Sequence, residues 1–472
     1  MPLVAGIDSS TQSCKIVIVD AVTGMLVREG RASHPEGTEV DPGHWWIALN
    51  EAIAAAGGLD DVGAVSIGGQ QHGMVVLDDR GRVIRPALLW NDTRSAPEAE
   101  ELTGHFGATA LASLTGSVPV AAFTSTKLLW LRNHEPDNAA RVAAVALPHD
   151  WLSWRLAGYG PEGESERGPV LDALWTDRSD ASGTGYFNPT SNIYCDEIIR
   201  FALGHVPKLP RLVLPGAHAD ETPSGVKIAC GAGDNAAAAF GLGASDGDVI
   251  VSLGTSGTVF AVSSSSTHDE SGTIAGFASA SGSFLPLVCT LNAARVIDSF
   301  ARLLQVTHDE LSELALSAQP GSGGIVLVPY FEGERTPNLP GSQAELVGLT
   351  LENYTRENVA RASIEGMLCG LSAGLMCLSD AGVACERIFL VGGAAANKAI
   401  QKVAAEIFGI TVVVPEPGEY VAIGAARQAA EVLLGKTPTW NLASLTLAPS
   451  PRAKSTIENY GRAARIVAER YH

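Results

Sequence analysis

The sequence is poor in basic residues. Its 472 residues include 32 lysines and arginines against 51 aspartates and glutamates, which gives a formal net charge of −19. A surface this negative disfavours nucleic acids and anionic membranes as partners, because both carry the same sign of charge. An anionic ligand would therefore need a local site made of backbone N–H groups, a metal ion or a few cations.

Cysteine pairs and long apolar runs are also missing. The seven cysteines include no Cys-x-x-Cys pair, and several stand in apolar stretches. This is typical of buried free thiols in a reducing compartment and argues against a zinc site. The first ten residues lack the basic region of a secretory signal, and no uninterrupted apolar stretch approaches the length of a bilayer span. We therefore expect a cytoplasmic protein with no membrane and no nucleic-acid partner.

Apolar residues are plentiful enough for two cores. Hydrophobic residues make up 46% of the chain and charged residues 18%, as in ordinary globular proteins, and the chain is longer than one core usually supports. Residues 4–19 and 249–262 repeat one pattern of strand, hydroxyl-rich turn and strand. This duplication predicts two homologous α/β domains, which we place at residues 1–243 and 244–472.

One stretch, Val226–Gly241, organises the first half of the chain. A short apolar run stops at Gly231, Asp234 follows a second glycine, and a run of alanines begins a helix. Asp234 fits two roles at this helix start. It can cap the helix by accepting hydrogen bonds from the first free N–H groups. It can also act as a catalytic base, because glycines let a substrate approach the backbone closely.

Four predicted turns share one design, in which a strand end is followed by small or hydroxyl residues with free backbone N–H groups. They are Asp8–Ser13, Gly231–Asn235, Gly254–Gly257 and Gly392–Asn397. Such turns attract phosphate without charged side chains. Two of them carry a carboxylate, Asp8 and Asp234. Phosphoryl transfer needs one group to hold Mg²⁺ and one to accept a proton from the attacking hydroxyl, and this pair fits that division.

Two other nucleotide-binding motifs fit less well. Gly435-Lys436-Thr437 looks like the end of a Walker A loop, but residue 430 is alanine and the triplet ends a predicted helix. The Gly-x-Gly-x-x-Ala pattern at 231–236 matches the dinucleotide fingerprint loosely, and it would set Asp234 against a pyrophosphate of like charge. An oxidoreductase is therefore the weaker alternative.

A series of longer motifs runs along the whole chain. They are GIDSSTQS at 6–13, DPxxWW at 41–46, GGQQHG at 68–73, WNDTR at 90–94, SDASGT at 179–184, GAGDNAA at 231–237, SLGTSG at 252–257, PYxxGERTP at 329–337 and the glycine pair at 392–393. In this order they resemble the FGGY carbohydrate kinases, and within that family most closely the D-xylulose kinases.

The resemblance implies an α/β fold of two actin-like (ribonuclease H-like) domains with a cleft between them. The first domain would bind the sugar and the second the nucleotide. The implied reaction is the ATP-dependent phosphorylation of a ketopentose, most directly D-xylulose to D-xylulose 5-phosphate in xylose catabolism. The alternatives are another substrate of the family, such as ribulose, glycerol or gluconate, or a catalytically inactive actin-like nucleotide-binding regulator. The presence of both Asp8 and Asp234 favours the enzyme.

The resemblance also assigns roles to residues. Asp234 is implied as the general base and Asp8 as the residue that serves Mg²⁺ and the phosphates, which makes both of them catalytic residues and metal ligands. A homodimer is compatible with this assignment, but the sequence leaves the oligomeric state open. The implied sugar-binding residues are Gln71, His72, Trp90, Asp234 and Asn235, and the implied ATP-binding residues are Ser10, Thr11, Gly254, Thr255, Ser256, Gly392, Gly393 and Asn397.

Some residues also have plain structural interpretations. His72 could be a structural histidine in a hairpin, although its place after a Gly-Gly strand end favours a ligand. Trp90 is evenly balanced between the core and the sugar site. Lys127 is expected to be a surface charge on a predicted helix.

Overall fold

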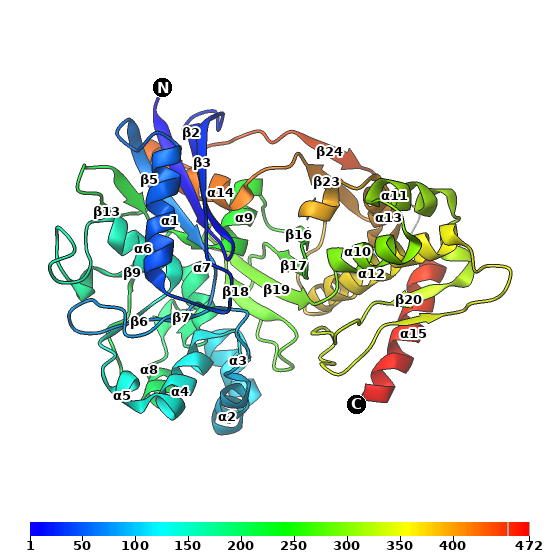
Figure 1. Cartoon of the computed structure of the whole chain (residues 1–472), viewed down its shortest axis with the longest axis horizontal. Helices are drawn as coiled ribbons and strands as arrows, with labels where there is room; N and C mark the ends of the chain where they lie inside the picture. The colour runs from blue at the N-terminus through cyan, green and yellow to red at the C-terminus, as the bar shows by residue number, and fades with distance from the viewer. Residues whose placement is uncertain (451–452, 472) are drawn as a thin grey trace. The chain divides into compact units, whose positions relative to one another are not determined.

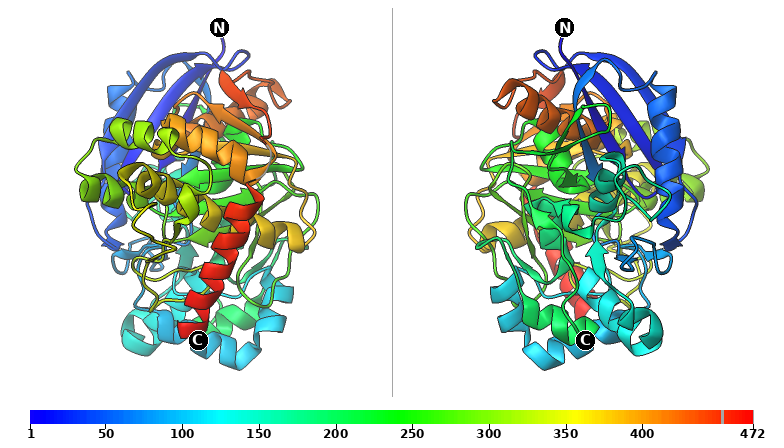
Figure 2. Two further views of the ribbon diagram at one scale, coloured as in Figure 1. Left: turned by 90° about the vertical axis from the view of Figure 1, so that its right-hand side faces the viewer. Right: turned by 90° about the vertical axis from the view of Figure 1, so that its left-hand side faces the viewer.

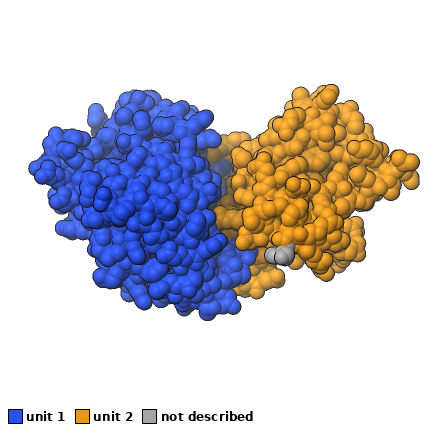
Figure 3. Space-filling model, turned by 60° about the horizontal axis from the view of Figure 1, so that its bottom comes forward, with its two compact units in different colours: residues 1–244, 264–285, 419–441 blue, residues 245–263, 286–418, 442–472 orange. Residues whose placement is uncertain are grey.

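The computed structural model describes residues 1–450 and 453–471. The chain divides into two compact units, coloured separately in Figure 3. Unit 1 comprises residues 1–244, 264–285 and 419–441, and unit 2 comprises residues 245–263, 286–418 and 442–472. The first division falls at residue 244, next to the boundary placed from the sequence, but two later segments belong to unit 1 by their contacts. The assignment of sugar and nucleotide binding to separate domains stays a prediction.

A mixed sheet forms the centre of unit 1. Its strand order is β13-β14-β5-β1-β2-β3, and β15 also pairs with β5. Strand β1 is antiparallel to β2 and parallel to β5, so the predicted hairpin at the start of the chain is confirmed. The bounds are β1 (Leu3–Ser9), β2 (Ser13–Asp20), β3 (Leu26–Ser33), β5 (Val62–Gly69), β13 (His218–Glu221), β14 (Lys227–Ala229) and β15 (Ala232–Gly233).

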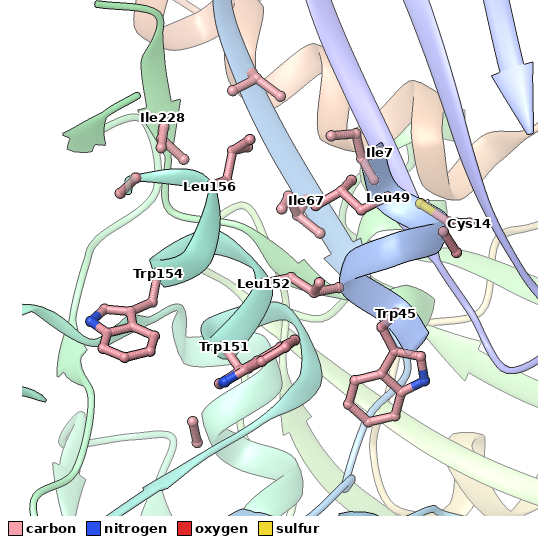
Figure 4. Close-up of a cluster of buried hydrophobic side chains, with 14 of the residues drawn as sticks. Ile7, Cys14, Trp45, Leu49, Ile67, Trp151, Leu152, Trp154, Leu156 and Ile228 are labelled. Carbon is pink, nitrogen blue, oxygen red and sulfur yellow. The ribbon is translucent and has the colours of Figure 1, made fainter. Parts of the chain in front are cut away.

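Helices cover both faces of this sheet, because successive residues of β1 point to opposite sides. Ile7 belongs to a core cluster that includes Trp45 and Leu49 of α1 (Pro42–Ala55) and Trp151 of α6 (Pro148–Leu156), as Figure 4 shows. Val4 belongs to a different cluster, formed with the alanines of α14 (Tyr420–Leu434). Helix α1 lies along β2 and β3 in Figures 1 and 2.

The start of α1 is set by the Asp-Pro pair of the DPxxWW motif. Asp41 is the N-cap and accepts a hydrogen bond from the backbone N–H of Gly43, while Pro42 is the first helical residue. Of the two roles that fit Asp234 at its helix start, the structure excludes the N-cap. Gly233 is the N-cap of α9 (Asp234–Leu242), and Asp234 is the first residue inside the helix.

A third apolar cluster supports most of the remaining helices of unit 1, with Leu128 of α4 and Ile198 of α8 among its members. The further helices are α2 (Ala96–Phe106), α3 (Ala108–Thr115), α4 (Thr124–His134), α5 (Pro136–Ala140), α7 (Arg178–Ala181) and α8 (Asp196–Leu203). The short strands are β4 (Glu39–Val40), β6 (Val75–Leu77), β7 (Ala87–Leu88), β8 (Ala144–Ala146), β9 (Trp175–Thr176), β10 (Phe187–Asn188), β11 (Ile193–Tyr194), β12 (Arg211–Leu212) and β18 (Ala275–Ala278).

Unit 2 repeats the arrangement of unit 1 at its sheet centre. Strand β16 is antiparallel to β17 and parallel to β22, as β1 is to β2 and β5. Its strands run in the order β19-β17-β16-β22-β23-β24. The bounds are β16 (Asp248–Leu253), β17 (Gly257–Ala261), β19 (Phe284–Thr290), β22 (Arg387–Val391), β23 (Thr411–Pro415) and β24 (Ser444–Leu447), with β20 (Val326–Val328) and β21 (Glu345–Val347) forming a separate pair.

The helices of unit 2 include α12 (Arg356–Asp380), α13 (Lys398–Phe408) and α15 (Lys454–Tyr471). Helix α15 packs against β20 and α12 and is prominent in Figure 2. The remaining helices are α10 (Ala294–Leu304) and α11 (His308–Ser317).

Helix α12 is long and apolar enough to cross a membrane by length and composition alone. However, 72% of its most apolar window is buried inside the protein. Val359, Ile364 and Leu371 are all buried, as in the central helix of a globular core.

In unit 1, the backbones of α14 and α9 are in close contact. A Cβ atom on Gly424 of α14 would lie 1.8 Å from the carbonyl oxygen of Ala237 in α9. We expect Gly424→Ala to lower the free energy of unfolding by about 1–3 kcal/mol or more, because neither backbone can give way easily. Urea unfolding of the full chain measures this loss.

The matched control is Gly104→Ala in α2, where a Cβ would meet no atom within 4 Å. This substitution should be neutral or stabilise by up to about 1 kcal/mol, because alanine is the better helix former. Equal effects of the two substitutions would contradict the tight contact.

Candidate active site

Asp8 sits at the end of β1, just before the tight turn into β2. Its side chain is only 3% exposed, and Ser10 Oγ donates a hydrogen bond to Asp8 Oδ1. Lys15 Nζ lies 4.0 Å from Asp8 Oδ2 and 2.5 Å from Glu419 Oε2. Burial raises the pKa of Asp8 to about 6, and the contacts with Ser10 and Lys15 only partly offset it. The result is a buried carboxylate whose ion-pair partner, Lys15, is shared with Glu419.

Asp234 is the first residue of α9, which also belongs to unit 1. Its Oδ1 accepts hydrogen bonds from the backbone N–H of Asn235 at 2.8 Å and from Asn235 Nδ2 at 3.1 Å. Burial raises the pKa of Asp234 to about 7, and the negative charge of Asp8 adds to the shift. The side chain is nevertheless partly exposed. A carboxylate with these properties is suited to accept a proton near neutral pH.

Gln71 and Asn235 extend this site into a row of hydrogen-bonded side chains. Asn235 Nδ2 also donates to Gln71 Oε1 at 3.3 Å, and Gln71 Nε2 donates to the carbonyl oxygen of Ser179 at 3.4 Å. The loop after β5 thus meets the turn before α9 side by side. Three of the residues predicted for the sugar site, Gln71, Asp234 and Asn235, are therefore brought together.

His72 is held in an unusual backbone conformation, with a φ of 68°. Its Nδ1 donates to the carbonyl oxygen of Gly183 at 2.5 Å, and its ring lies 4.8 Å from the ring of Phe123 and 5.7 Å from that of Phe277. A non-glycine residue with positive φ persists only where its surroundings enforce it, and such residues cluster at functional sites. The geometry therefore supports His72 as more than a hairpin residue.

Trp90 is not a core residue. Its side chain is 42% exposed, and its Nε1 donates to Thr11 Oγ1 at 2.9 Å. Thr11 lies in the turn that follows Asp8 and was predicted to bind ATP. It therefore contacts a residue that was predicted to bind the sugar.

The prediction that Lys127 is a surface charge is wrong. Its side chain is fully buried, its Nζ donates to the carbonyl oxygen of Ala122, and burial lowers its pKa to about 7.

Unit 2 contains a pocket of about 420 Å³. Four residues predicted for ATP line it: Gly254, Thr255, Gly393 and Asn397. Ser256 and Gly392 are not among its lining residues, so their role stays a prediction. Asn397 also caps α13 by accepting hydrogen bonds from the N–H groups of residues 399 and 400, which fixes the end of the pocket.

Most of the pocket wall was missed from the sequence. The other lining residues are Leu253, Ala294, Ile297, Asp298, His308, Asp309, Ala394, Ala396 and Ile400. They come largely from the starts of α10, α11 and α13, which are separated by up to a hundred residues. Apolar positions on these helices resemble ordinary core positions, and no local pattern marks them as pocket residues.

Comparison with known proteins decides the family. Models of the N-terminal and C-terminal domains of the FGGY family of carbohydrate kinases match residues 3–241 and 249–431. This chain belongs to the FGGY family of carbohydrate kinases. The match confirms the family predicted from the motifs, which together span most of the chain.

Individual FGGY relatives cover nearly the full chain. The xylulose kinase of Streptomyces rubiginosus is 43% identical over 456 residues, which cover 93% of this chain and 89% of that protein. That of Streptomyces coelicolor is 43% identical over 463 residues, covering 94% and 92%. The crystal structure of xylulose kinase from Bifidobacterium adolescentis superposes with a TM-score of 0.92 at 46% identity, covering 98% of this chain and 99% of that one. The predicted two-domain α/β fold is confirmed.

The residues of this FGGY kinase fit a magnesium ion at Asp8 and Asp234. The negative charge of Asp8 raises the pKa of Asp234, so a cation near the two carboxylates would be favoured, and oxygen is the ligand that Mg²⁺ prefers. Mg²⁺ is usually bound by one or two carboxylates together with substrate phosphates. Among the described residues, the only cluster of three or more potential metal ligands is His149, Asp150 and Asp180, so Asp8 and Asp234 would depend on the phosphates in this way.

The raised pKa of Asp234 makes folding stability depend on pH. The carboxyl binds its proton more tightly in the folded protein, with a pKa of about 7, than at its ordinary value of 3.8. Its contribution to stability is therefore complete below pH 4 and is lost as the pH rises through 7. We expect Asp234→Asn to raise the thermal midpoint at pH 8 by about 2 °C or more relative to the wild type, and by less at pH 5.

Differential scanning calorimetry at both pH values tests this expectation. Asp196→Asn is the matched control, because Asp196 is also the first residue of a helix but is exposed. A gain in midpoint that is the same at pH 5 and pH 8, or the same in both variants, would show that Asp234 has no raised pKa.

Proposed function

We propose that this FGGY kinase transfers the γ-phosphate of ATP to D-xylulose and forms D-xylulose 5-phosphate, in xylose catabolism. The observation that carries the proposal is the row formed by Asp234, Asn235 and Gln71, in a chain whose relatives over nearly its full length are named xylulose kinases. Polar side chains that differ in donors and acceptors are suited to orient a polyhydroxy substrate. A cytoplasmic location and a homodimer stay predictions.

Asp234 is the general base of the proposed reaction. The sugar hydroxyl gives its proton to the Asp234 carboxylate while its oxygen forms the new bond to the γ-phosphorus, and ADP leaves with the electrons of the broken P–O bond. Near neutral pH a base with a pKa of about 7 is partly ionised and still basic enough to take the proton. Asn235 orients the carboxylate through two hydrogen bonds.

Gln71 and His72 are the proposed sugar ligands, and Trp90 is proposed to cover the sugar with its exposed ring. Asp8, with Asp234, would hold Mg²⁺, whose role when bound is to neutralise charge on the phosphates. Ser10 and Thr11 supply hydroxyl and N–H groups next to Asp8 for the phosphates. Burial of Asp8 excludes water from this carboxylate.

The pocket of unit 2 is the proposed binding site for ATP. The proposed phosphate donors are the N–H groups of the turns that contain Gly254, Thr255, Ser256, Gly392 and Gly393. The apolar wall formed by Ile297 and Ile400 suits the flat base, and Asn397 supplies a polar group at the pocket edge.

The base assignment predicts a large loss of activity in Asp234→Asn. The amide keeps the shape of the side chain but cannot accept the proton, so phosphorylation of D-xylulose should fall by about 10²–10⁴-fold. ADP release in a coupled assay measures turnover, and calorimetric titration with ATP should show that the nucleotide still binds. The control Asp196→Asn should keep wild-type turnover.

Near-normal turnover of Asp234→Asn would show that another group takes the proton. The same assay, run on the wild type with D-xylulose, ribulose, glycerol and gluconate, tests the proposed substrate. A higher kcat/KM for any of the other three would overturn the assignment of D-xylulose.

A large side chain that fills the proposed nucleotide pocket should weaken ATP binding and leave sugar binding almost unchanged. Ala396 lines the pocket and is exposed, so Ala396→Phe should reduce the space without disturbing a packed core. We expect KM for ATP to rise by about tenfold or more, equivalent to about 1.4 kcal/mol of binding, with a small effect on KM for the sugar. Steady-state kinetics with each substrate varied in turn measures both constants.

Ala384→Phe is the matched control, because Ala384 is an exposed alanine of unit 2 outside the pocket lining. It should leave both constants unchanged. If Ala396→Phe bound ATP as tightly as the control does, the pocket would not be the nucleotide site.

A further inference from the structure

A cluster of charged side chains is enclosed behind the proposed sugar residues. His149 at the start of α6 and Asp180 of α7 are completely buried, and Asp150 is 1% exposed. One potential ligand or hydrogen-bonding atom from each lies within 4.8 Å of the others. The proposed mechanism gives these three residues no role, and enclosing so many ionisable groups is costly unless they are paired.

His149 is held between two carboxylates. Its Nδ1 lies 2.6 Å from Asp180 Oδ2, which is a hydrogen bond, and its Nε2 lies 3.4 Å from Asp150 Oδ1 without hydrogen-bond geometry. The second oxygen of Asp150 accepts the N–H of Leu147 and so caps α6. Burial alone would lower the pKa of His149, but the two carboxylates outweigh it and raise this pKa to about 10. The hydrogen bond to Asp180 and the nearby oxygen of Asp150 therefore favour the protonated ring of His149.

The segment that contains Asp180 holds the sugar residues from behind. Within residues 178–184, Ser179 Oγ accepts the N–H of Gly233 at 3.1 Å, and the carbonyl oxygen of Ser179 accepts Gln71 Nε2 at 3.4 Å. The carbonyl oxygen of Gly183 accepts His72 Nδ1 at 2.5 Å. One short segment thus contacts both sugar residues of the loop after β5 and the residue that precedes Asp234.

The ring of His149 also contacts the turn that leads to Asp234. Gly231 has a φ of 87°, and a Cβ atom there would lie 2.3 Å from His149 Cδ2. The ring therefore occupies space that only glycine leaves free, next to the start of the turn. Through Asp180 on one side and Gly231 on the other, His149 connects the two loops that carry the proposed sugar ligands and the base.

A metal ion is a poorer interpretation of the same cluster. A histidine that binds a metal must give up the proton of the coordinating nitrogen. Both ring nitrogens of His149 face carboxylate oxygens, an arrangement that favours the doubly protonated ring. The cluster is therefore an ion pair with an additional acid rather than a set of metal ligands.

We propose that His149 and Asp180 are positioning residues of the sugar site. Their ion pair fixes residues 178–184, and these in turn hold Gln71, His72 and the turn before Asp234 in the geometry needed for transfer. The proposal rests on the proposed function because it takes the kinetics of the sugar as its main measure.

Asp180→Asn is the principal test. It keeps the size of the side chain but removes the charge that pairs with His149. The expected result is a fall of kcat/KM for the sugar by about 10–100-fold, since small displacements of positioned groups cost this much. KM for ATP should stay within about twofold of the wild type, because the proposed nucleotide pocket belongs to unit 2.

Glu365→Gln is the matched control. Glu365 is buried and accepts a hydrogen bond from Arg361 at 2.7 Å, so the same chemical change breaks a similarly buried ion pair in unit 2. Both variants should lower the thermal midpoint, but only Asp180→Asn should impair the sugar kinetics. Equal sugar kinetics in the two variants, or equal changes in both KM values of Asp180→Asn, would overturn the proposal.

A milder variant tests the proposal even if Asp180→Asn fails to fold. Ser179→Ala removes the acceptor of the Gly233 N–H and should show the same selective loss, whereas wild-type sugar kinetics would overturn the proposal. In the double variant His149→Gln with Asp180→Asn, the loss should be smaller than the product of the single losses, because the two residues act as a pair. Multiplying losses would contradict the pairing.

Two measurements separate this proposal from the proposed function. Hydrogen exchange should increase in residues 68–73 and 231–235 of Asp180→Asn but not of Glu365→Gln, whichever sugar the enzyme uses; unchanged exchange would overturn positioning. A wild type that is inactive on D-xylulose would overturn only the proposed function. One equivalent of zinc that binds the purified wild type but not His149→Gln would show that His149 is a ligand and not a cation, and would also overturn the proposal.

Discussion

Carboxylates in the interior of unit 1 are the constraint on which its chemistry depends. Asp8, Asp150, Asp177 and Asp180 are all buried, with Asp234 partly so, and burial raises the pKa of each. Two of these acids are stabilised by capping short helices: Asp150 caps α6, and Asp177 accepts the N–H groups of residues 179 and 180. Asp180 has His149, and Asp8 shares Lys15 with Glu419. The charge of Asp234 is supported by Asn235 and by its own backbone N–H, and Asp234 is the acid that the proposed reaction protonates.

The sequence predicted the strands and turns of the site well, because each depends on residues close in the chain. Strands β1 and β14 follow from apolar runs that stop near Asp8 and at Gly231, whereas β15 (Ala232–Gly233) lies inside the segment predicted to be a turn. It failed where the environment is set by distant residues. Lys127 has a helical pattern that suits a surface position, but the packing of unit 1 encloses it completely. His149 and Asp180 are separated by 31 residues, and neither has a local feature that predicts their hydrogen bond. The pocket residues of α10 and α11 likewise have no local feature that predicts their place in the pocket wall.

The two units show how one strand pattern can carry different chemistry. In both, the first strand pairs with an antiparallel neighbour and with a parallel strand that follows later in the chain. The register of unit 1 sets Asp8 opposite Lys15, so a charge pair stands at the end of its hairpin. The register of unit 2 sets Leu253 opposite Gly257, with Gly254 and Thr255 in the turn. The strands preserve the packing, while the turns differ by presenting a carboxylate in one unit and free backbone groups in the other.

Helix α14 is the last helix of unit 1 to be made, and this has a consequence for synthesis on the ribosome. Until residues 420–434 have emerged, the sheet face that contains Val4, Val17 and Ala64 has no cover, and Lys15 has no Glu419. The nascent chain must therefore keep an apolar face unpaired while almost the whole of unit 2 is translated. Exposed surface of this kind is a target for chaperones and a route to misassembly. Completion of the first unit thus waits for nearly the end of the message, and a ribosome that stops early releases a chain whose sheet lacks the cover of α14 on one face.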